Sequence, residues 1–485
     1  MSGLVAALEL ARRKCRVTVV EAAPFAGGRT SSWRTASGVH ADTGLHVVAS
    51  HYVNLLEVLT SVGAVERLTW WNEHLYLRRG ARPMRMRLSR LPAPFHLLRP
   101  ARAIPVTVGT RARLARAALE IARYRQDELQ RFDNQTYLEW HRARGLGDGF
   151  LLELAQFAAD ATTFLEIDAV SARPVLSWLK YMFRNQHSAR IGTWRMPIAE
   201  GLVAPLVSAL KAAGGSLQLG TVAVGLAAAD GRVRGVEVRR SEASKPSCSE
   251  DGHVSSAGPS EELVCDAVVS ALPVQSLRQV LGPELAARAR LERALELRTV
   301  PAMSVLLTLD RPLRPRVEGV ALVAGDCIRN VVDLHSLWGC DGDGDGALLQ
   351  CLVGRASERA VQPDAEIVEA ALEDLRAVWP AFRSAVPIEA RVDRIPAAMV
   401  AALPGSHAKR PVTETGIANL FVAGDWSRHD LNASIEGAVV SGRLAAGAVL
   451  RDEARNAVRI LPLSEPRARR MASARTHEIH GATGT

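Results

Sequence analysis

One glycine and one acid near the start of the chain stand at a spacing that can bind a dinucleotide. Gly3 opens a predicted helix over residues 2–14, and Glu21 follows 18 positions later at the end of the apolar strand "VTVVEA". Dinucleotide-binding units offer backbone N–H groups to a pyrophosphate at a Gly-rich turn before the first helix, and an acid about 20 residues further on accepts from the adenosine ribose. Gly3 and Glu21 fit the last glycine and the acid of that pattern.

The strand and the first two glycines that the pattern places ahead of Gly3 are missing from the sequence given. We therefore expect Met1 to stand where an internal residue of the turn belongs. The missing strand should leave an unpaired, apolar gap beside Val17–Val20, at a cost in stability. A chain that binds no cofactor is the alternative that this departure leaves open.

Three further motifs supply groups for a flavin dinucleotide. The Gly-rich loop "GGRTSS" carries Arg29 shortly after the ribose acid, and "VAGD" places Asp425 at a strand end, where it can accept from a ribityl hydroxyl. The helix in "ASIEGAVVSGRLAA" offers its N-terminal donors and dipole to negative charge that develops at the N1/C2 edge of a flavin. In this order, the motifs together predict an FAD site.

Length and composition indicate a large globular enzyme. The 485 residues are 48% apolar and 23% charged, which allows two or three structural units and a large core. The six cysteines form no CxxC pair or Cys/His cluster, so we expect neither a disulfide framework nor a metal site. No apolar stretch is long enough to span a bilayer, and the N-terminus lacks the basic region of a secretory signal, so the default is a cytoplasmic protein.

The net charge of +9 is concentrated in one segment. Residues 78–125 hold thirteen arginines and one acid, Glu120, interleaved with apolar residues. Such a segment fits either a solvated, arginine-rich helix pair or the surface of an anionic membrane. Nucleic acid is disfavoured because no aromatic-studded basic groove accompanies the charge.

The order of elements predicts an α/β fold in which a Rossmann-like FAD-binding domain, lacking its first strand, is interleaved with a mixed-sheet and helical substrate domain. Asp230-Gly231 between alternating apolar runs predicts a hairpin. The expected parts are FAD-binding residues 1–75, 196–290 and 411–450, a helical membrane-facing cap at 76–195, a substrate sheet at 291–410, a flexible insertion at 241–262 and a disordered basic tail at 451–485.

The motifs resemble the FAD-dependent amine oxidase and carotenoid desaturase superfamily. "SGLVAALELARRKCRVTVVEA", "GGRTSS", "DTGLHVVASHYVNLLEVL", "RLPAPFHLL", "LRTVPAMSVLLTLDRPL" and "NLFVAGDWSRHDLNASIEGAVVSGRLAA" are most similar to plant and cyanobacterial phytoene and ζ-carotene desaturases and to hydroxysqualene dehydroxylases. The resemblance implies that "LPAPFHLL" faces a membrane at the mouth of an apolar tunnel, which favours the membrane interpretation of residues 78–125.

The resemblance also implies a set of cofactor-binding residues. Glu21 would bind the adenosine ribose and Val222 would meet adenine through its backbone. The other expected contacts are the phosphate turn at Gly3, the pyrophosphate and ribityl path at Gly27, Gly28, Arg29 and Thr30, the flavin-facing loop at Gly44, Leu45 and His46, and the flavin site at Gly424, Asp425, Ile435, Glu436, Gly437 and Ala438.

The resemblance implies hydride transfer from an allylic carbon to flavin, which requires little acid–base machinery from the protein. Arg298 is the candidate for a polar group near the flavin or substrate, with a surface arginine as the alternative. A flavin amine oxidase would be expected to carry a lysine near residues 299–309 and an aromatic residue just before the "EGA" helix, and neither is present. An isoprenoid substrate is therefore favoured, with quinone or oxygen as the electron acceptor; desaturation, isomerisation and dehydroxylation are not separated.

Overall fold

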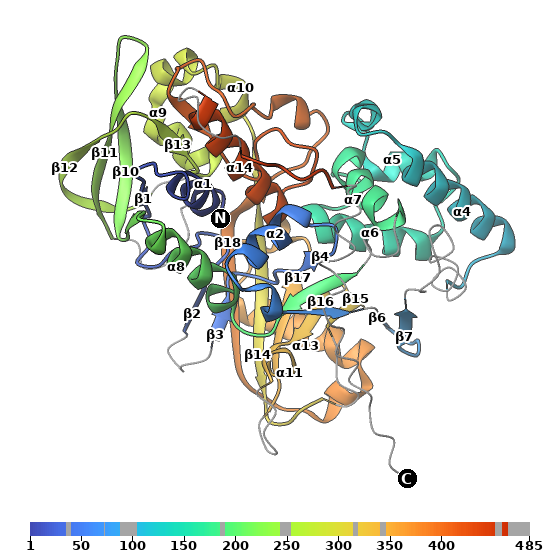
Figure 1. The fold of residues 1–485 in the computed structure, drawn as a ribbon. Helices are drawn as coiled ribbons and strands as arrows, with labels where there is room; N and C mark the ends of the chain where they lie inside the picture. Colours follow the sequence, from blue (N-terminus) through green and yellow to red (C-terminus); the bar gives the residue numbers. More distant parts are fainter. Residues whose placement is uncertain are drawn as a thin grey trace.

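A computed structural model describes residues 1–34, 40–71, 73–87, 104–184, 190–242, 254–313, 319–339, 346–451 and 458–463. The "RLPAPFHLL" motif at residues 90–98 lies outside these ranges, as do residues 243–253 of the expected insertion. In Figure 1, the helices α4–α7 form one end of the molecule and the strands β10–β12 the opposite end, with α1 and α14 between them.

The part expected to bind the dinucleotide contains two separate parallel strand pairs. β1 (Thr18–Val20) pairs with β9 (Ser216–Gln218), and β13 (Val268–Ser270) pairs with β19 (Leu420–Val422). No hydrogen-bonded ladder joins the two pairs within the described part of the chain. The expected gap beside Val17–Val20 is therefore confirmed.

Helix α1 (Ser2–Ala11) packs closely on α14 (Ile435–Arg451) beside these strands. Gly442 permits the approach, because a Cβ atom at this position would lie 2.5 Å from the Ser2 carbonyl oxygen. The small residues of α14 thus bring the last helix of the domain against its first.

The predicted hairpin at Asp230-Gly231 is confirmed. Both residues have positive φ angles, +52° and +75°, which suit the tight turn between β10 (Thr221–Ala229) and β11 (Arg232–Ser241). β12 (Ser256–Val264) then pairs antiparallel with β11. The expectation of a flexible insertion over residues 241–262 is thus wrong for residues 256–262, where pairing with β11 overrides the polar composition.

A seven-stranded mixed sheet has the order β18-β14-β17-β16-β15-β6-β7 and is built mostly from residues 299–400. Its strands are β6 (Glu73–Arg78), β7 (Met84–Arg87), β14 (Thr299–Leu309), β15 (Val320–Ala324), β16 (Ile328–Asp333), β17 (Leu348–Val353) and β18 (Pro387–Val400). The amphipathic helix α13 (Asp364–Val378) packs its buried residues into one core with this sheet. β6 and β7 extend this sheet from the segment expected to be helical, so the cap is not purely helical.

A helical lobe lies within the segment 76–195 that was expected to be a helical cap. It comprises α4 (Val108–Arg123), η3 (Asp127–Phe132), α5 (Tyr137–Arg142), α6 (Gly149–Thr163) and α7 (Ala172–Arg184). A capping box fixes the start of α5: the Thr136 hydroxyl accepts from the Glu139 N–H, and the Glu139 carboxylate accepts from the Thr136 N–H. None of the described helices is long and apolar enough to cross a membrane.

Smaller elements connect these parts. The short strands are β2 (Ser32–Arg34) with β3 (His40–Asp42), and β4 (Val48–Ala49) with β8 (Ile191–Trp194) and β5 (Leu68–Trp71). The remaining helices are α2 (Val53–Ser61), η1 (Val65–Arg67), η5 (Ala199–Val203), α8 (Ala204–Ala212), α9 (Val274–Arg288), α10 (Glu292–Leu295), α11 (Leu334–Trp338), α12 (Ala356–Arg359), η6 (Pro380–Ser384) and η7 (His407–Lys409).

Part of the expected disordered tail is packed on the domain. Leu461 is buried, its N–H donates to the Asn54 side-chain oxygen at 2.9 Å, and its carbonyl accepts from the Asn54 Nδ2 atom at 2.9 Å. The expectation of disorder beyond residue 451 is therefore wrong at this position, because one apolar side chain and a paired amide anchor the backbone.

Candidate active site

One continuous cavity of about 1980 Å³ runs between the dinucleotide-binding part and the helical lobe. Its volume exceeds the roughly 300–1,000 Å³ of an ordinary small-molecule pocket. Residues from α1, the loop after β1 and the start of α14 line one part, whereas α4, α6, α7 and β14 line the other. The cavity can therefore hold two ligands, or one ligand beside a long apolar chain.

Fourteen of the sixteen expected cofactor-binding residues line this cavity. They are Gly3, Glu21, Gly27, Gly28, Arg29, Thr30, Gly44, Leu45, His46, Val222, Gly424, Asp425, Ile435 and Ala438.

Gly27 makes a turn that a side chain would block. Its φ is +116°, and a Cβ atom there would lie 2.4 Å from the Thr30 carbonyl oxygen. The Thr30 N–H closes the turn by donating to the Gly27 carbonyl at 3.1 Å. Gly28 also has a positive φ, +59°, but a Cβ atom there would meet nothing within 4 Å. The loop is thus a narrow backbone cradle at the cavity wall.

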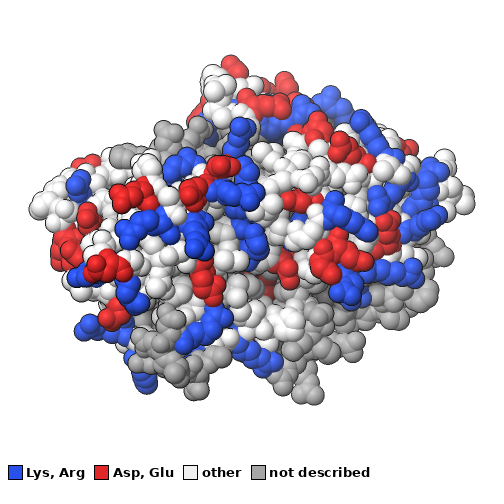
Figure 2. Space-filling view, turned by 90° about the horizontal axis from the view of Figure 1, so that it is seen from above, with Lys and Arg blue, Asp and Glu red and all other residues white. Residues whose placement is uncertain are grey.

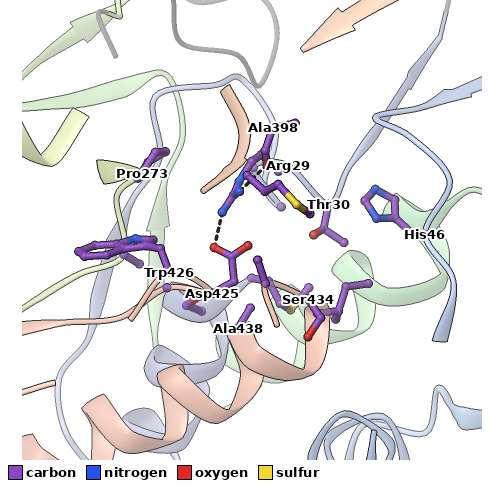
Figure 3. Close-up of a pocket in the computed structure, with 18 of the residues that line it drawn as sticks. Arg29, Thr30, His46, Pro273, Ala398, Asp425, Trp426, Ser434 and Ala438 are labelled. Carbon is purple, nitrogen blue, oxygen red and sulfur yellow. Dashed lines mark hydrogen bonds and ion pairs between the residues drawn. The ribbon is translucent and has the colours of Figure 1, made fainter. Parts of the chain in front are cut away.

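Arg29 and Asp425 join this cradle to the strand that precedes α14. The Arg29 Nη2 atom donates to the Asp425 Oδ1 atom at 2.7 Å, and Nη1 donates to the Ala398 carbonyl (Figure 3). Burial raises the pKa of Asp425, but the neighbouring Arg29 charge and its hydrogen bond outweigh burial and hold that pKa below its ordinary value. Asp425 is therefore a carboxylate at the cavity wall.

Glu21 lies in the same cavity at the end of β1. Its Oε1 atom accepts from the Ala23 N–H at 2.9 Å, and burial raises the pKa of the carboxyl. Val222, on the neighbouring strand β10, lines the cavity beside it. This acid and a β-strand backbone are the groups that would hold an adenosine end.

Glu436 and Gly437 do not line the cavity, which corrects the expectation for them. The Glu436 carboxylate is fully buried and accepts from the Asn54 N–H, the Asn54 Nδ2 atom and the Leu55 N–H at 2.7–3.0 Å. Burial raises its pKa to about 7 against these hydrogen bonds. Glu436 ties the first turn of α14 to α2 and so positions the cavity walls.

His46 contributes a neutral imidazole to the cavity wall. Burial and the Arg29 charge lower its pKa to about 4. Figure 3 places His46 beyond Thr30, on the far side of the Arg29–Asp425 pair from Trp426. At neutral pH this part of the wall adds no positive charge beyond that of Arg29.

The other part of the cavity is predominantly apolar. α4, α6 and α7 contribute Leu114, Ala118, Leu154, Phe157, Ala158, Trp178, Leu179, Met182 and Phe183, and the central strand β14 contributes Ala302, Met303 and Ser304. Asp160 also lines it, but its carboxylate lies 3.6 Å from the Arg329 guanidinium. Burial raises the Asp160 pKa to about 7, so this part carries little negative charge.

A family model described as flavin containing amine oxidoreductase matches residues 1–450. The chain belongs to this family. Among curated relatives, a 15-cis-phytoene desaturase of an Oncidium hybrid cultivar is 25% identical over 467 residues, covering 93% of this chain and 76% of that protein. A probable zeta-carotene desaturase of Synechococcus elongatus is 24% identical over 484 residues, covering 94% and 98%.

Solved structures of low identity share the fold. An oxidoreductase from Methanosarcina mazei has a TM-score of 0.66 at 17% identity, with 91% of this chain and 96% of that chain covered. A putrescine oxidase bound to putrescine has a TM-score of 0.65 at 14% identity, with 93% and 97% covered. This flavin-containing amine oxidoreductase family member is an FAD-dependent enzyme of α/β fold.

The residues present fit FAD in this family member. Gly27 and Gly28 line the cavity with backbone that carries no side chain, Glu21 and Asp425 are carboxyl groups on its wall, and α14 begins at Ile435 beside it. The Ser434 hydroxyl accepts from the Gly437 N–H at 3.1 Å and caps that helix. When bound here, FAD supplies the redox chemistry of the family.

Arg298 is exposed and does not line the cavity. The Arg298 carbonyl accepts a hydrogen bond from the Ala401 N–H at 2.8 Å, beside the ladder between β14 and β18. The expectation of a polar group near the flavin is wrong for this residue, because the side chain points away from the cavity although β14 itself reaches it.

Several cavity residues escaped the sequence analysis. Trp426 is buried and donates its indole N–H to the Leu272 carbonyl at 3.1 Å. Pro273 and Ser434 also line the cavity. Trp426 directly follows Asp425, and a Cβ atom on Gly424 would lie 2.4 Å from its Nε1 atom. The sequence "GDW" at residues 424–426 was the local signal from which Trp426 could have been predicted to lie at the site. Ala398 and Met399 come from β18, and no local motif marks them.

Proposed function

We propose that this chain oxidises a long, apolar isoprenoid by transferring a hydride from an allylic carbon to FAD. The observation that carries the proposal is the apolar lining beside the flavin-binding part. β14 contributes Ala302, Met303 and Ser304 to the cavity and no lysine, and the segment before α14 contributes Asn432, Ala433 and Ser434 and no aromatic residue. These are the two places where the amine oxidase alternative requires a lysine and an aromatic residue.

The electrostatics of the cavity support the same choice. A protonated amine needs a carboxylate or an aromatic cage to compensate its charge on leaving water. Asp160 lies 3.6 Å from Arg329, Asp393 forms an ion pair with Arg391, and Asp425 forms an ion pair with Arg29. An uncharged polyene has no such requirement and gains free energy in proportion to the apolar area that it buries.

The chain's own groups would then bind, orient and exclude water rather than transfer protons. The helices α4, α6 and α7 would align the polyene along the cavity, and the first turn of α14 would stabilise negative charge that develops on the reduced cofactor. The curated relatives carry the names phytoene desaturase and zeta-carotene desaturase. Desaturation is the reaction proposed first, and dehydroxylation of a hydroxysqualene-like alcohol is kept as the second isoprenoid reaction.

The test compares flavin reduction by isoprenoids and by amines. The protein, loaded with excess FAD and kept anaerobic, would be mixed with liposomes that contain phytoene, ζ-carotene or hydroxysqualene, or with putrescine. We expect phytoene or ζ-carotene to bleach the oxidised-flavin absorbance and putrescine to leave it unchanged. Hydroxysqualene, whose dehydroxylation consumes a hydride, should instead restore the oxidised spectrum of protein whose FAD has been reduced beforehand. Bleaching by putrescine alone would assign the chain to the amine oxidases. A quinone or oxygen added afterwards should restore the oxidised spectrum.

We propose further that the substrate enters from a membrane along α4. One face of α4 lines the cavity through Leu114, Ala115, Ala118 and Ala122. Arg113, Arg116 and Arg123 on the same helix are exposed, and Val108 at its start is 80% exposed. Figure 2 shows several basic side chains at the end of the molecule where Figure 1 places α4, with acidic and basic groups mixed elsewhere on that face.

Flotation with liposomes tests this entry route. Replacing Arg113, Arg116 and Arg123 together by Gln should weaken binding to anionic liposomes at least about tenfold, since each basic residue near such a surface contributes about 1 kcal/mol. The matched control replaces Arg232, Arg234 and Arg240 of β11, which are also exposed and carry the same total charge. If both variants lose the same affinity for anionic liposomes, the binding depends on the net charge of the protein and not on the position of α4.

A further inference from the structure

Two polar side chains of α5 line the cavity within the helical lobe. Tyr137 and His141 stand four positions apart, which places them on the same face of this helix, and both line the cavity. Their rings meet edge to face, with 4.6 Å between the centroids. The lobe also lines the cavity with Leu151, Leu154 and Ala155 of α6. The pair thus adds polar atoms to a predominantly apolar wall.

The imidazole of His141 is buried without a partner. The residue is 6% exposed, and neither ring nitrogen makes a hydrogen bond of normal geometry to a described residue. Burial lowers its pKa to about 4, together with the Arg144 charge and against the opposing effect of the Leu146 backbone. The ring is therefore neutral, so one nitrogen can donate and the other can accept. Buried polar groups without partners are costly and rare, so a polar ligand atom is expected here.

Tyr137 supplies a second neutral group beside this imidazole. The residue is 3% exposed, and burial alone raises the pKa of its phenol. The hydroxyl therefore stays protonated and can donate a hydrogen bond. Arg144, whose charge acts on the imidazole, forms an ion pair with Glu120 at 2.6 Å and lies over the Trp140 ring. The pair thus offers neutral donors and an acceptor, and the Arg144 charge is already compensated.

The pair lies in the part of the cavity that is far from the expected flavin position. Figure 1 places α5 in the helical end of the molecule, away from α1 and α14. The flavin ring is expected between His46 and Ala438, near Asp425, and these residues line the other part of the cavity. A ligand whose reacting carbon lies at the flavin would therefore meet Tyr137 and His141 with a part that is remote from that carbon.

We propose that Tyr137 and His141 bind a hydroxyl group at the end of the isoprenoid that lies away from the flavin. The inference rests on the proposed function, because it assigns one end group of the same apolar substrate. A hydroxyl group can donate to an imidazole nitrogen and accept from the Tyr137 hydroxyl, so it pairs both buried groups at once. A hydrocarbon end would leave them unpaired, and a site built to bind a hydroxyl group discriminates strongly against an analogue that lacks it.

The neutrality of the pair selects a hydroxyl group over a charged end group. A carboxylate on the ligand would need a cation to compensate its charge on leaving water, and a protonated amine would need a carboxylate. The pair supplies neither, because the imidazole and the phenol are both uncharged at neutral pH.

Transfer of labelled isoprenoids from liposomes to the FAD-loaded protein tests the pair. The liposomes would carry geranylgeraniol or the matched hydrocarbon in which a CH3 group replaces the CH2OH group. The ratio of alcohol to hydrocarbon transferred should fall about tenfold in Tyr137→Phe and in His141→Phe, because each variant removes one partner of the hydroxyl group. The control Phe157→Leu changes the apolar wall of α6 and should leave this ratio unchanged.

Nuclear magnetic resonance separates hydrogen bonding from packing. In protein labelled with 15N-histidine, the His141 ring signals are those that are missing from His141→Phe or, if that variant does not fold, from His141→Gln. Geranylgeraniol should shift these signals in the wild type, and the matched hydrocarbon should not.

Equal ratios in the wild type and both variants, or ring signals that the hydrocarbon shifts as far as the alcohol does, would overturn the proposal. Stronger transfer of geranylgeranoic acid than of the alcohol, lost in Arg111→Gln, would also overturn it and assign an anionic end group to that residue of α4. Flavin bleaching by phytoene with unchanged ratios would overturn the end-group assignment alone. Transfer of neither isoprenoid and no bleaching would contradict the proposed function as well.

Discussion

The Arg29 guanidinium lies 2.7 Å from the Asp425 carboxylate although the two residues are 396 positions apart. This ion pair connects the Gly-rich loop after β1 to the strand end before α14, and both residues line the cavity. Asp425→Ala would leave the Arg29 charge without its partner in a partly buried site. We expect FAD affinity to fall about 10–100-fold and the free energy of unfolding to fall by about 2 kcal/mol.

Fluorescence titration with FAD and chemical denaturation would measure these two losses. The matched control is Asp430→Ala, which removes an exposed acid from the same connection. If the two variants bind FAD equally well, Asp425 has no part in the cofactor site.

Alanine substitutions at the two adjacent glycines of the cradle test two different effects. At Gly27 a new Cβ atom would clash with the loop, whereas at Gly28 only the positive φ angle would be strained. Gly27→Ala places a Cβ atom 2.4 Å from the Thr30 carbonyl and must displace the loop, whereas Gly28→Ala meets no atom within 4 Å. Gly28→Ala should cost about 1 kcal/mol for its positive φ. Gly27→Ala should cost more and abolish FAD retention after gel filtration. Equal FAD retention by both variants would show that the cradle does not approach the cofactor.

Arg298→Ala should leave FAD affinity, turnover and the free energy of unfolding nearly unchanged. The side chain is exposed and outside the cavity, and such surface substitutions usually stay within about 0.5 kcal/mol. Arg29→Ala, which breaks the ion pair with Asp425, is the comparison in the same assays. A selective loss of turnover in Arg298→Ala would return this residue to the active site.

Asp42 should make the protein less stable as pH rises toward neutrality. It is buried, and burial raises its pKa to about 7 against hydrogen bonds from Ser32 and Ile198. Between its ordinary pKa and about 7, the folded state holds a proton that the unfolded state has released, so the free energy of unfolding falls as pH rises. The contribution is on the order of 4 kcal/mol, since the rise of about three pKa units corresponds to about 1.4 kcal/mol per unit.

Urea denaturation from pH 4 to pH 8 would isolate this contribution. Asp160 and Glu436 also have raised pKa values and give slopes of the same sign, so the relevant quantity is the difference between wild type and Asp42→Asn. That difference should grow between pH 4 and pH 7 in favour of the variant. Parallel curves would mean that Asp42 is ionised throughout this range.

The local elements of the fold were predictable because their signals are short-range. Asp230-Gly231 specified a turn that needs two positive φ angles. The incorporation of β6 into a sheet built mostly from residues 299–400 depends on pairing with β15, some 245 residues later. No periodicity within β6 carries that information.

The candidate site shows the same difference between short-range signals and contacts between distant segments. Gly27, Asp425 and Ala438 line the cavity, because backbone geometry, a strand end and a helix start fix their places. Glu436 was misplaced because its partners, Asn54 and Leu55, belong to a helix nearly 400 residues earlier. Arg298 was misplaced because one residue at a strand end decides whether a side chain faces the cavity or the solvent.

A crystal structure of the chain grown with excess FAD tests the central claim most directly, that one cavity holds both FAD and an apolar substrate. The account predicts density for the adenosine end beside Glu21 and Val222 and for the flavin ring between His46 and Ala438, with the cavity among α4, α6 and α7 left free for an added polyene. FAD in the opposite orientation, or a flavin ring that fills the space among those helices, would contradict it.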